Sequence, residues 1–188
     1  MKFDEIIIVN GNKLTKKYIE SLTKEERMSL IDPIFNVLRT NGWMYPDDLK
    51  SVKKEYGKLE LYNPDITNSE CFNNSSLATN ICKYYCRNFY LARNKGKNTM
   101  IDNFNDDNIL KRIIYNRLGL EWIDDVNESF NLSFKMTIQA QRSMRLINQT
   151  SMFKPSIAKY MYLKYSEEGD VVFDYSAGWG GRLLGASS

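Results

Sequence analysis

Histidine is absent from the 188-residue sequence, and proline and cysteine are scarce, with four and three residues. Histidine is the side chain that most often exchanges protons in catalysis near neutral pH, so this chain has none for that role. No apolar run approaches the roughly 20 residues that a membrane-spanning helix needs. The opening residues 1–9 are too short and too acidic for a secretory signal peptide. We therefore expect a cytoplasmic protein that has no membrane partner.

The cysteines, Cys71, Cys82 and Cys86, are odd in number. Cys82 and Cys86 are one helical turn apart, and that spacing can serve a metal ion. However, the sequence offers no histidine and only one further thiol as additional ligands. Buried free thiols in a reducing compartment are the favoured interpretation, and we expect no metal site.

The charge is nearly balanced, with 26 basic and 23 acidic residues and a net charge of +3. This balance does not by itself argue for a nucleic-acid partner. Hydrophobic residues make up 43% of the chain, which is enough for a core. The length fits one domain, or one domain and part of another.

Residues 1–149 have the patterns of a mostly helical domain with one short strand, residues 3–9, ended by a turn at Asn10-Gly11-Asn12. Thr23 and Glu26 have the spacing of a capping box. The helix that follows should be kinked or split by Pro33 and ended by Asn41-Gly42. Other helices are expected over residues 14–22, 47–56, 77–93, 106–118 and 133–147.

Two of these predicted helices carry residues that suit nucleic acid. Lys50, Lys53 and Lys54 make helix 47–56 basic, between an Asp47 cap and a Gly57 stop. A solvated face is the favoured interpretation, and a phosphate-contacting face is the alternative. Aromatic residues occur alongside basic residues over 77–93. A place for these rings in the core is the favoured interpretation, and stacking on bases is the alternative. No serine or cysteine in this region has a neighbouring base, so no catalytic group is predicted here.

The C-terminal stretch, residues 151–188, has a different pattern. A helix opened by Pro155 is followed by a polar turn and then by the β-branched and aromatic run 171–173, which predicts a buried strand. Asp174 ends this run. Gly178, Gly180 and Gly181 come next, and a helix is expected to begin just after them.

A strand, a glycine-rich turn and a helix form the first half of a nucleotide-binding βα unit. The glycine spacing fits the dinucleotide fingerprint poorly. Instead, Asp-x-Ser-Ala-Gly-x-Gly-Gly-Arg resembles the first cofactor motif of class I S-adenosylmethionine-dependent DNA methyltransferases of the adenine type. Phe153-Lys154-Pro155 resembles the extra motif that these enzymes place one helix upstream. The pair of motifs is also similar to phage-like DNA methylases, and it covers about the last fifth of the chain.

The resemblance implies a cofactor, S-adenosylmethionine, and a role for each matching residue. Asp174 would lie near the ammonium group of the methionine moiety. The cofactor would lie against a wall of main chain, and an upstream segment would close the methionine end. The wall would be Ser176, Ala177, Gly178 and Gly180, and the closing segment Phe153, Lys154 and Pro155.

The family's catalytic Asn/Asp-Pro-Pro-aromatic motif is absent, because no two of Pro33, Pro46, Pro64 and Pro155 are adjacent. We therefore predict a helical domain over residues 1–149 and, over residues 150–188, the first βα unit of a truncated Rossmann-like α/β methyltransferase domain. A second polypeptide or a missing C-terminal part would complete that domain.

The implied function is methyl transfer to a DNA base, adenine N6, by the completed enzyme, while this chain alone would be inactive. DNA is the implied partner. Two alternatives stay open: a non-catalytic nucleic-acid-binding or interaction module, and a methyltransferase that acts on RNA or protein.

Overall fold

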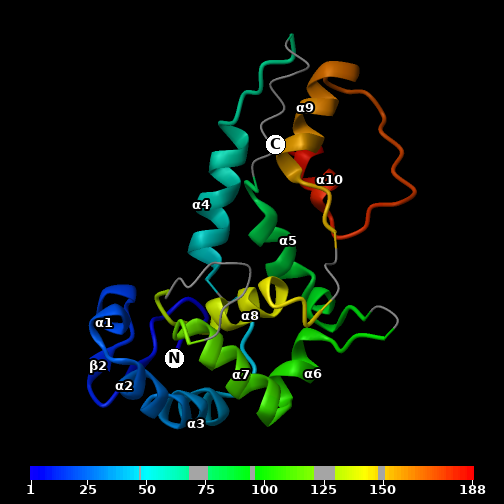
Figure 1. The fold of residues 1–188 in the computed structure, drawn as a ribbon. Helices are drawn as coiled ribbons and strands as arrows, with labels where there is room; N and C mark the ends of the chain where they lie inside the picture. The colour runs from blue at the N-terminus through cyan, green and yellow to red at the C-terminus, as the bar shows by residue number, and fades with distance from the viewer. Residues whose placement is uncertain (47, 68–75, 94–95, 121–129, 148–150) are drawn as a thin grey trace. The chain divides into compact units, whose positions relative to one another are not determined.

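The computed structural model describes residues 1–46, 48–67, 76–93, 96–120, 130–147 and 151–188. The described part of the chain is mostly helical (Figure 1). Contacts divide the chain into two units: unit 1 contains residues 1–46 and 90–149, and unit 2 contains residues 47–89 and 150–188. The sequence-predicted boundary near Gln149 falls outside the described residues.

Unit 1 is built from short helices and one small hairpin. Its elements are β1 (Ile8–Val9), β2 (Asn12–Lys13), α1 (Lys16–Ser21), α2 (Lys24–Ser29), α3 (Ile31–Asn41), α6 (Met100–Asn105), α7 (Asp107–Arg117) and α8 (Phe134–Ser143). Trp43 is partly buried and makes edge-on ring contacts with Tyr90, Phe104 and Phe134 at centroid distances of 5.3–5.7 Å. These large rings supply much of the apolar contact that holds the unit together.

Local sequence explains where several helices of unit 1 begin and end. The capping box of Thr23 and Glu26 is present at the start of α2, as the sequence predicts. The predicted helix is interrupted at Leu30, so Pro33 lies in the first turn of α3, where its missing N–H costs no helical hydrogen bond. Gly42 ends α3 with a positive φ. Asp106 caps α7, and Ser133 caps α8.

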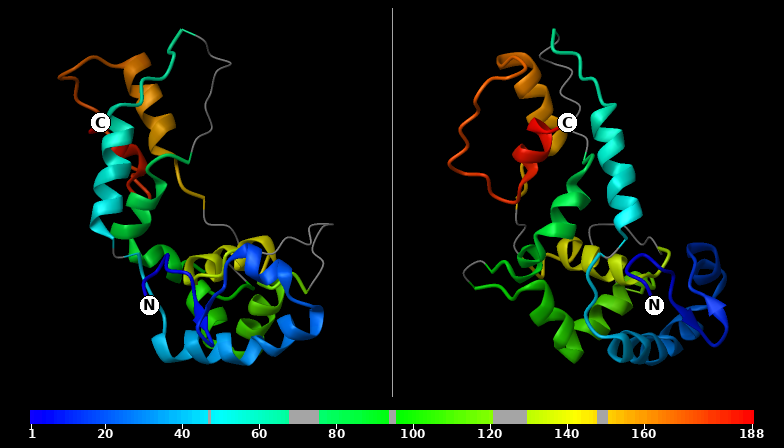
Figure 2. Two further views of the ribbon diagram at one scale, coloured as in Figure 1. Left: turned by 90° about the vertical axis from the view of Figure 1, so that its left-hand side faces the viewer. Right: turned by 180° about the vertical axis from the view of Figure 1, so that it is seen from behind.

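Unit 2 contains α4 (Leu49–Glu60), α5 (Thr79–Tyr85), α9 (Pro155–Tyr165) and α10 (Gly181–Ala186). The 3-10 helix η1 (Arg87–Leu91) contains the boundary between the units. Leu59 of α4 packs with Ala78 and Ile81, and Leu184 of α10 packs against the same cluster. Helices α9 and α10 lie side by side in every view (Figures 1 and 2).

The strand predicted at residues 171–173 is wrong. These residues are in no strand, and Val171 and Phe173 are 98% and 86% exposed. Figure 2 shows the segment between α9 and α10 as a wide loop that projects from both helices. A strand needs a neighbour to satisfy its main-chain hydrogen bonds, and the only sheet among the described residues is the hairpin of β1 and β2. The helix expected after the glycines is confirmed as α10.

Three other expectations are corrected. The strand predicted over residues 3–9 shrinks to β1, because Asn10 and Gly11 turn the chain back within a two-residue ladder. Gly57 does not stop α4, which continues to Glu60, and the cap of this helix is Asp48, whereas Asp47 lies outside the described residues. The long helix predicted over 77–93 is divided at Cys86 into α5 and η1.

Candidate cofactor-binding site

The two stretches that the sequence predicted to act together lie against each other in unit 2. Pro155 opens α9 as its first residue, where a fixed φ and a missing N–H are tolerated. A Cβ added to Gly181 at the start of α10 would lie 1.9 Å from the main-chain oxygen of Phe153. The guanidinium of Arg182 lies over the ring of Phe153, 5.3 Å from its centroid. The glycine turn and the Phe153-Lys154-Pro155 segment are therefore direct neighbours.

The glycines of this region divide into two groups. Gly181 and Gly185 are buried and face α9, and a Cβ on Gly185 would lie 2.5 Å from the Cβ of Ala158 and 2.7 Å from the main-chain oxygen of Pro155. These two positions allow the close approach of two helices. Gly178 and Gly180 have φ values of +57° and +81°. A Cβ added to Gly178 would have one neighbour, Ser176 O at 3.7 Å, and a Cβ added to Gly180 would have none within 4 Å. Open space therefore adjoins the main chain at Gly178 and Gly180.

The turn also presents polar main-chain groups. Ser176, Ala177 and Gly178 are exposed, and Gly180 N donates to Ala177 O at 3.1 Å to close the turn. Within the described residues, the N–H groups of Ala177 and Gly178 have no hydrogen-bond acceptor. Adjacent free N–H groups in a turn form a favourable place for a carboxylate or other anion.

Asp174 is held by Arg182. The Arg182 Nε donates to Asp174 Oδ2 at 2.8 Å, and Arg182 Nη2 donates to Oδ1 at 3.0 Å. The Ser176 N–H donates to the same Oδ1 at 3.0 Å. These contacts hold the pKa of Asp174 below its ordinary value, with the Arg182 hydrogen bonds as the largest cause and the Ser176 N–H second. Three of about four acceptor positions of the carboxylate are thus occupied, which leaves one on Oδ2.

Trp179 anchors the turn to the rest of unit 2. Its ring contacts Phe89 edge-on at 5.5 Å, and its main-chain oxygen lies 3.6 Å from the Cys86 Sγ. At the far end of α10, the Tyr56 hydroxyl donates to Ser187 O at 2.6 Å. Helix α10 and the turn before it are therefore fixed at both ends.

Sequence reasoning missed the roles of Arg182, Trp179 and Lys159. Lys159 is buried, and its Nζ donates to Leu59 O and Glu60 O at 2.8 Å each, which caps the C-terminus of α4 from α9. Burial lowers the pKa of Lys159. The close packing at Gly181 and Gly185 was not predicted either, although their four-residue spacing places both on one face of a helix. No local pattern indicated the Arg182 pair or the lysine cap, because both join residues far apart in the chain or across a turn.

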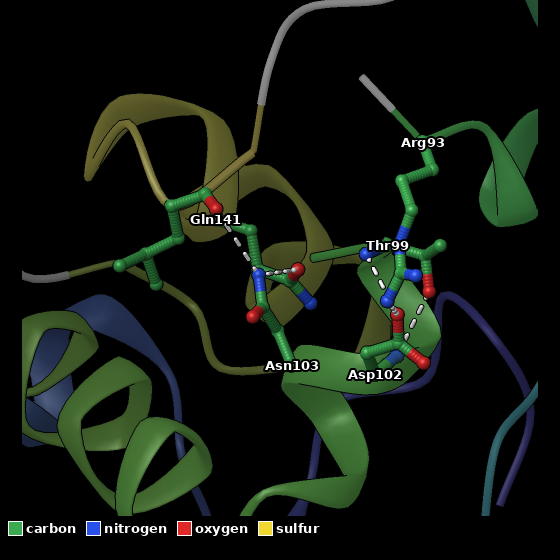
Figure 3. Close-up of polar contacts among 6 residues, drawn as sticks. Arg93, Thr99, Asp102, Asn103 and Gln141 are labelled. Carbon is green, nitrogen blue, oxygen red and sulfur yellow. Dashed lines mark hydrogen bonds and ion pairs between the residues drawn. The ribbon is translucent and has the colours of Figure 1, made fainter. Parts of the chain in front are cut away.

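A second polar cluster, in unit 1, has a structural role (Figure 3). Thr99 and Asp102 form a capping box at the start of α6, and Asp102 also accepts from Arg93 at 3.1 Å. The buried Asn103 donates to Gln141 of α8 at 3.2 Å. These bonds join α6 to α8 and use the polar groups for packing.

The chain matches no protein-family model, no curated protein and no solved structure. None of the described helices is both long and apolar enough to cross a membrane.

Proposed function

We propose that unit 2 contributes the first part of an S-adenosylmethionine site to a DNA methyltransferase. The completed enzyme would transfer the methyl group to adenine N6. The observation that carries the proposal is the contact between the Phe153 segment and the glycine turn, because the resemblance requires these two stretches to border one ligand.

The groups on the turn suit the methionine end of the cofactor. The free N–H groups of Ala177 and Gly178 can donate to its carboxylate. The remaining acceptor position on Asp174 Oδ2 can accept from its ammonium group. Gly178 and Gly180 leave room for the ligand beside the main chain. Phe153 and Pro155 adjoin the nearby Gly181 and would close one side of this space. Lys154, the residue before α9, would complete that side.

The exposed run 171–173 supports a further strand-bearing partner. Within the described residues its main chain makes no hydrogen bond, and its three consecutive apolar side chains are exposed. An extended segment of this composition pairs readily with a β-strand. We assign that strand to the rest of the methyltransferase domain, carried by a second polypeptide or by further chain. This partner would also supply the catalytic motif that the sequence lacks.

A nucleic-acid-binding module without catalysis is the second candidate, and the lysines on α4 favour it. Methyl transfer to RNA or protein is a third, because the acceptor is chosen by residues outside the cofactor turn. DNA binding that is unchanged by the cofactor would favour the module, while methyl transfer by the completed enzyme would favour the first proposal.

The test is calorimetric titration of the chain with S-adenosylmethionine, using Asp174→Asn and Asp170→Asn as matched variants. Each variant removes one carboxylate. Within the described residues, the Asp170 carboxylate accepts one hydrogen bond, from the Glu167 N–H. We expect weak binding, with Kd on the order of 1 mM, because half of the pocket is supplied by the partner. Asp174→Asn should weaken it by about tenfold, and Asp170→Asn by less than about twofold. Equal effects of the two variants would contradict the role of Asp174.

A further inference from the structure

The exposed side of α4 consists almost entirely of lysines. Val52, Tyr56 and Leu59 face the cluster that contains Ala78 and Ile81. At about 100° per residue, the opposite side of the helix is a sector of roughly 140°. That sector holds four lysines, all exposed, which we call the lysine face: Lys50, Lys53, Lys54 and Lys58.

Nothing on the helix neutralises this face. Glu55 is turned towards α5, where its Oε1 accepts from Asn80 Nδ2 at 2.6 Å, and Glu60 lies at the end of the helix. None of the four lysines forms an ion pair within the described part of the chain. Lys50 and Lys54, and Lys54 and Lys58, are separated by four residues, a spacing at which like charges destabilise a helix. The four lysines therefore destabilise the helix, and within the described residues no ion pair compensates for this.

Gly57 lies within the same sector. It is in the interior of α4, its φ is not positive, and no atom beyond its chain neighbours and the nearby backbone of α4 lies within 4 Å of the place where a Cβ would be. Glycine in a helix interior is less stable than alanine, and the fold gives no steric reason for it here. Its effect is to expose bare main chain between the lysines, where a partner can approach closely.

We infer that the lysine face binds the phosphate backbone of duplex DNA. Lys50 and Lys58 are about 12 Å apart along the axis of α4. Along the axis of duplex DNA, this length corresponds to three to four phosphates of one strand. Lysine acts as a point charge, which suits binding to the phosphates of DNA whatever the base sequence. Insertion into a lipid surface requires an exposed apolar side, and the apolar side of α4 is occupied by the core of unit 2. The inference rests on the proposed function in that DNA is the substrate there.

The test measures fluorescence anisotropy of a labelled duplex of mixed sequence over a series of salt concentrations, with no cofactor present. Four phosphate contacts predict a slope of log K against log salt of about −3.6. Lys53→Gln/Lys54→Gln should reduce the magnitude of the slope by about 1.8 and weaken binding about tenfold at low salt. Glutamine is as good a helix former as lysine, so α4 is retained, as circular dichroism can verify.

The matched control is Lys17→Gln/Lys24→Gln, which removes two exposed lysines of unit 1 that form no ion pair within the described residues. It changes the net charge equally and should leave the slope unchanged. Equal slopes for the two double variants would overturn the inference, as would binding to phosphatidylcholine–phosphatidylserine vesicles but not to duplex. Because no cofactor is used, this outcome is independent of the titration that tests the cofactor site.

Discussion

Asp174 and Arg182 form a two-point ion pair across the glycine turn, with nitrogen–oxygen distances of 2.8 and 3.0 Å. The seven residues between them include every exposed residue of the candidate cofactor wall. The pair therefore fixes the turn, and it also neutralises the carboxylate that the sequence assigned to the cofactor. A ligand must share Asp174 with Arg182.

This relationship predicts the acid behaviour of Asp174. Its pKa is lowered in the folded protein, so its stabilising contribution is present above the unfolded pKa, about 3.9, and is lost as the pH falls through the lower folded value. Arg182→Gln should raise the pKa of Asp174 towards its ordinary value without reaching it, since the Ser176 N–H still donates to the carboxylate. Carboxyl carbon NMR titration of both proteins measures this, and an unchanged pKa would show that Arg182 is not the main cause.

The two groups of glycines predict different substitution costs. Gly185→Ala places a Cβ against the main chain of α9 and should lower the free energy of unfolding of unit 2 by about 3 kcal/mol. Gly180→Ala meets no neighbour but must adopt a positive φ, which costs about 1 kcal/mol. Urea unfolding followed by circular dichroism compares the variants. A larger loss for Gly180→Ala would contradict the close packing of α9 and α10.

The buried amine of Lys159 predicts a third effect. Lys159→Met keeps the length of the side chain but leaves the last carbonyls of α4 without their donor, at a cost of about 1–3 kcal/mol. Lys164→Met on the same helix removes a lysine that contacts only Tyr160 and Tyr165 in the described structure, so it should change stability by less than about 0.5 kcal/mol. Thermal unfolding of both variants would reject the cap if their melting temperatures were equal.

The two described cysteines should differ in reactivity. Burial raises the pKa of Cys82 to about 11, which keeps the thiol protonated at pH 8, whereas Cys86 is partly exposed. Only the thiolate is alkylated, so iodoacetamide should modify Cys86 well before Cys82. Peptide mapping by mass spectrometry over time measures the order, and faster modification of Cys82 would contradict its burial.

Local patterns predicted much of the secondary structure, because caps and stops depend on neighbouring residues. The Thr23–Glu26 capping box, the end of α3 at Gly42 and the start of α9 at Pro155 are confirmed for this reason. Gly57 does not end α4, because the packing of Leu59 against α5 stabilises the helix beyond this residue.

The predicted strand at 171–173 failed for a different reason. Its composition is that of a buried strand, but strand formation depends on a neighbour, and composition cannot supply one. In the candidate site, too, features set by local sequence differ from those set by tertiary contacts. The closeness of Phe153 to the glycine turn followed from motif order, whereas the Arg182 pair and the Lys159 cap depend on tertiary contacts.

An NMR titration of the labelled chain with S-adenosylmethionine tests directly whether the glycine turn binds the cofactor. We predict that the amide signals of Ser176, Ala177, Gly178 and Gly180, and of Lys154, shift together with one common dissociation constant. Signals of α1 and α7 in unit 1 should stay in place. Absence of shifts at millimolar cofactor, or shifts confined to residues outside the turn and the Phe153 segment, would contradict the assignment of this turn as a cofactor site.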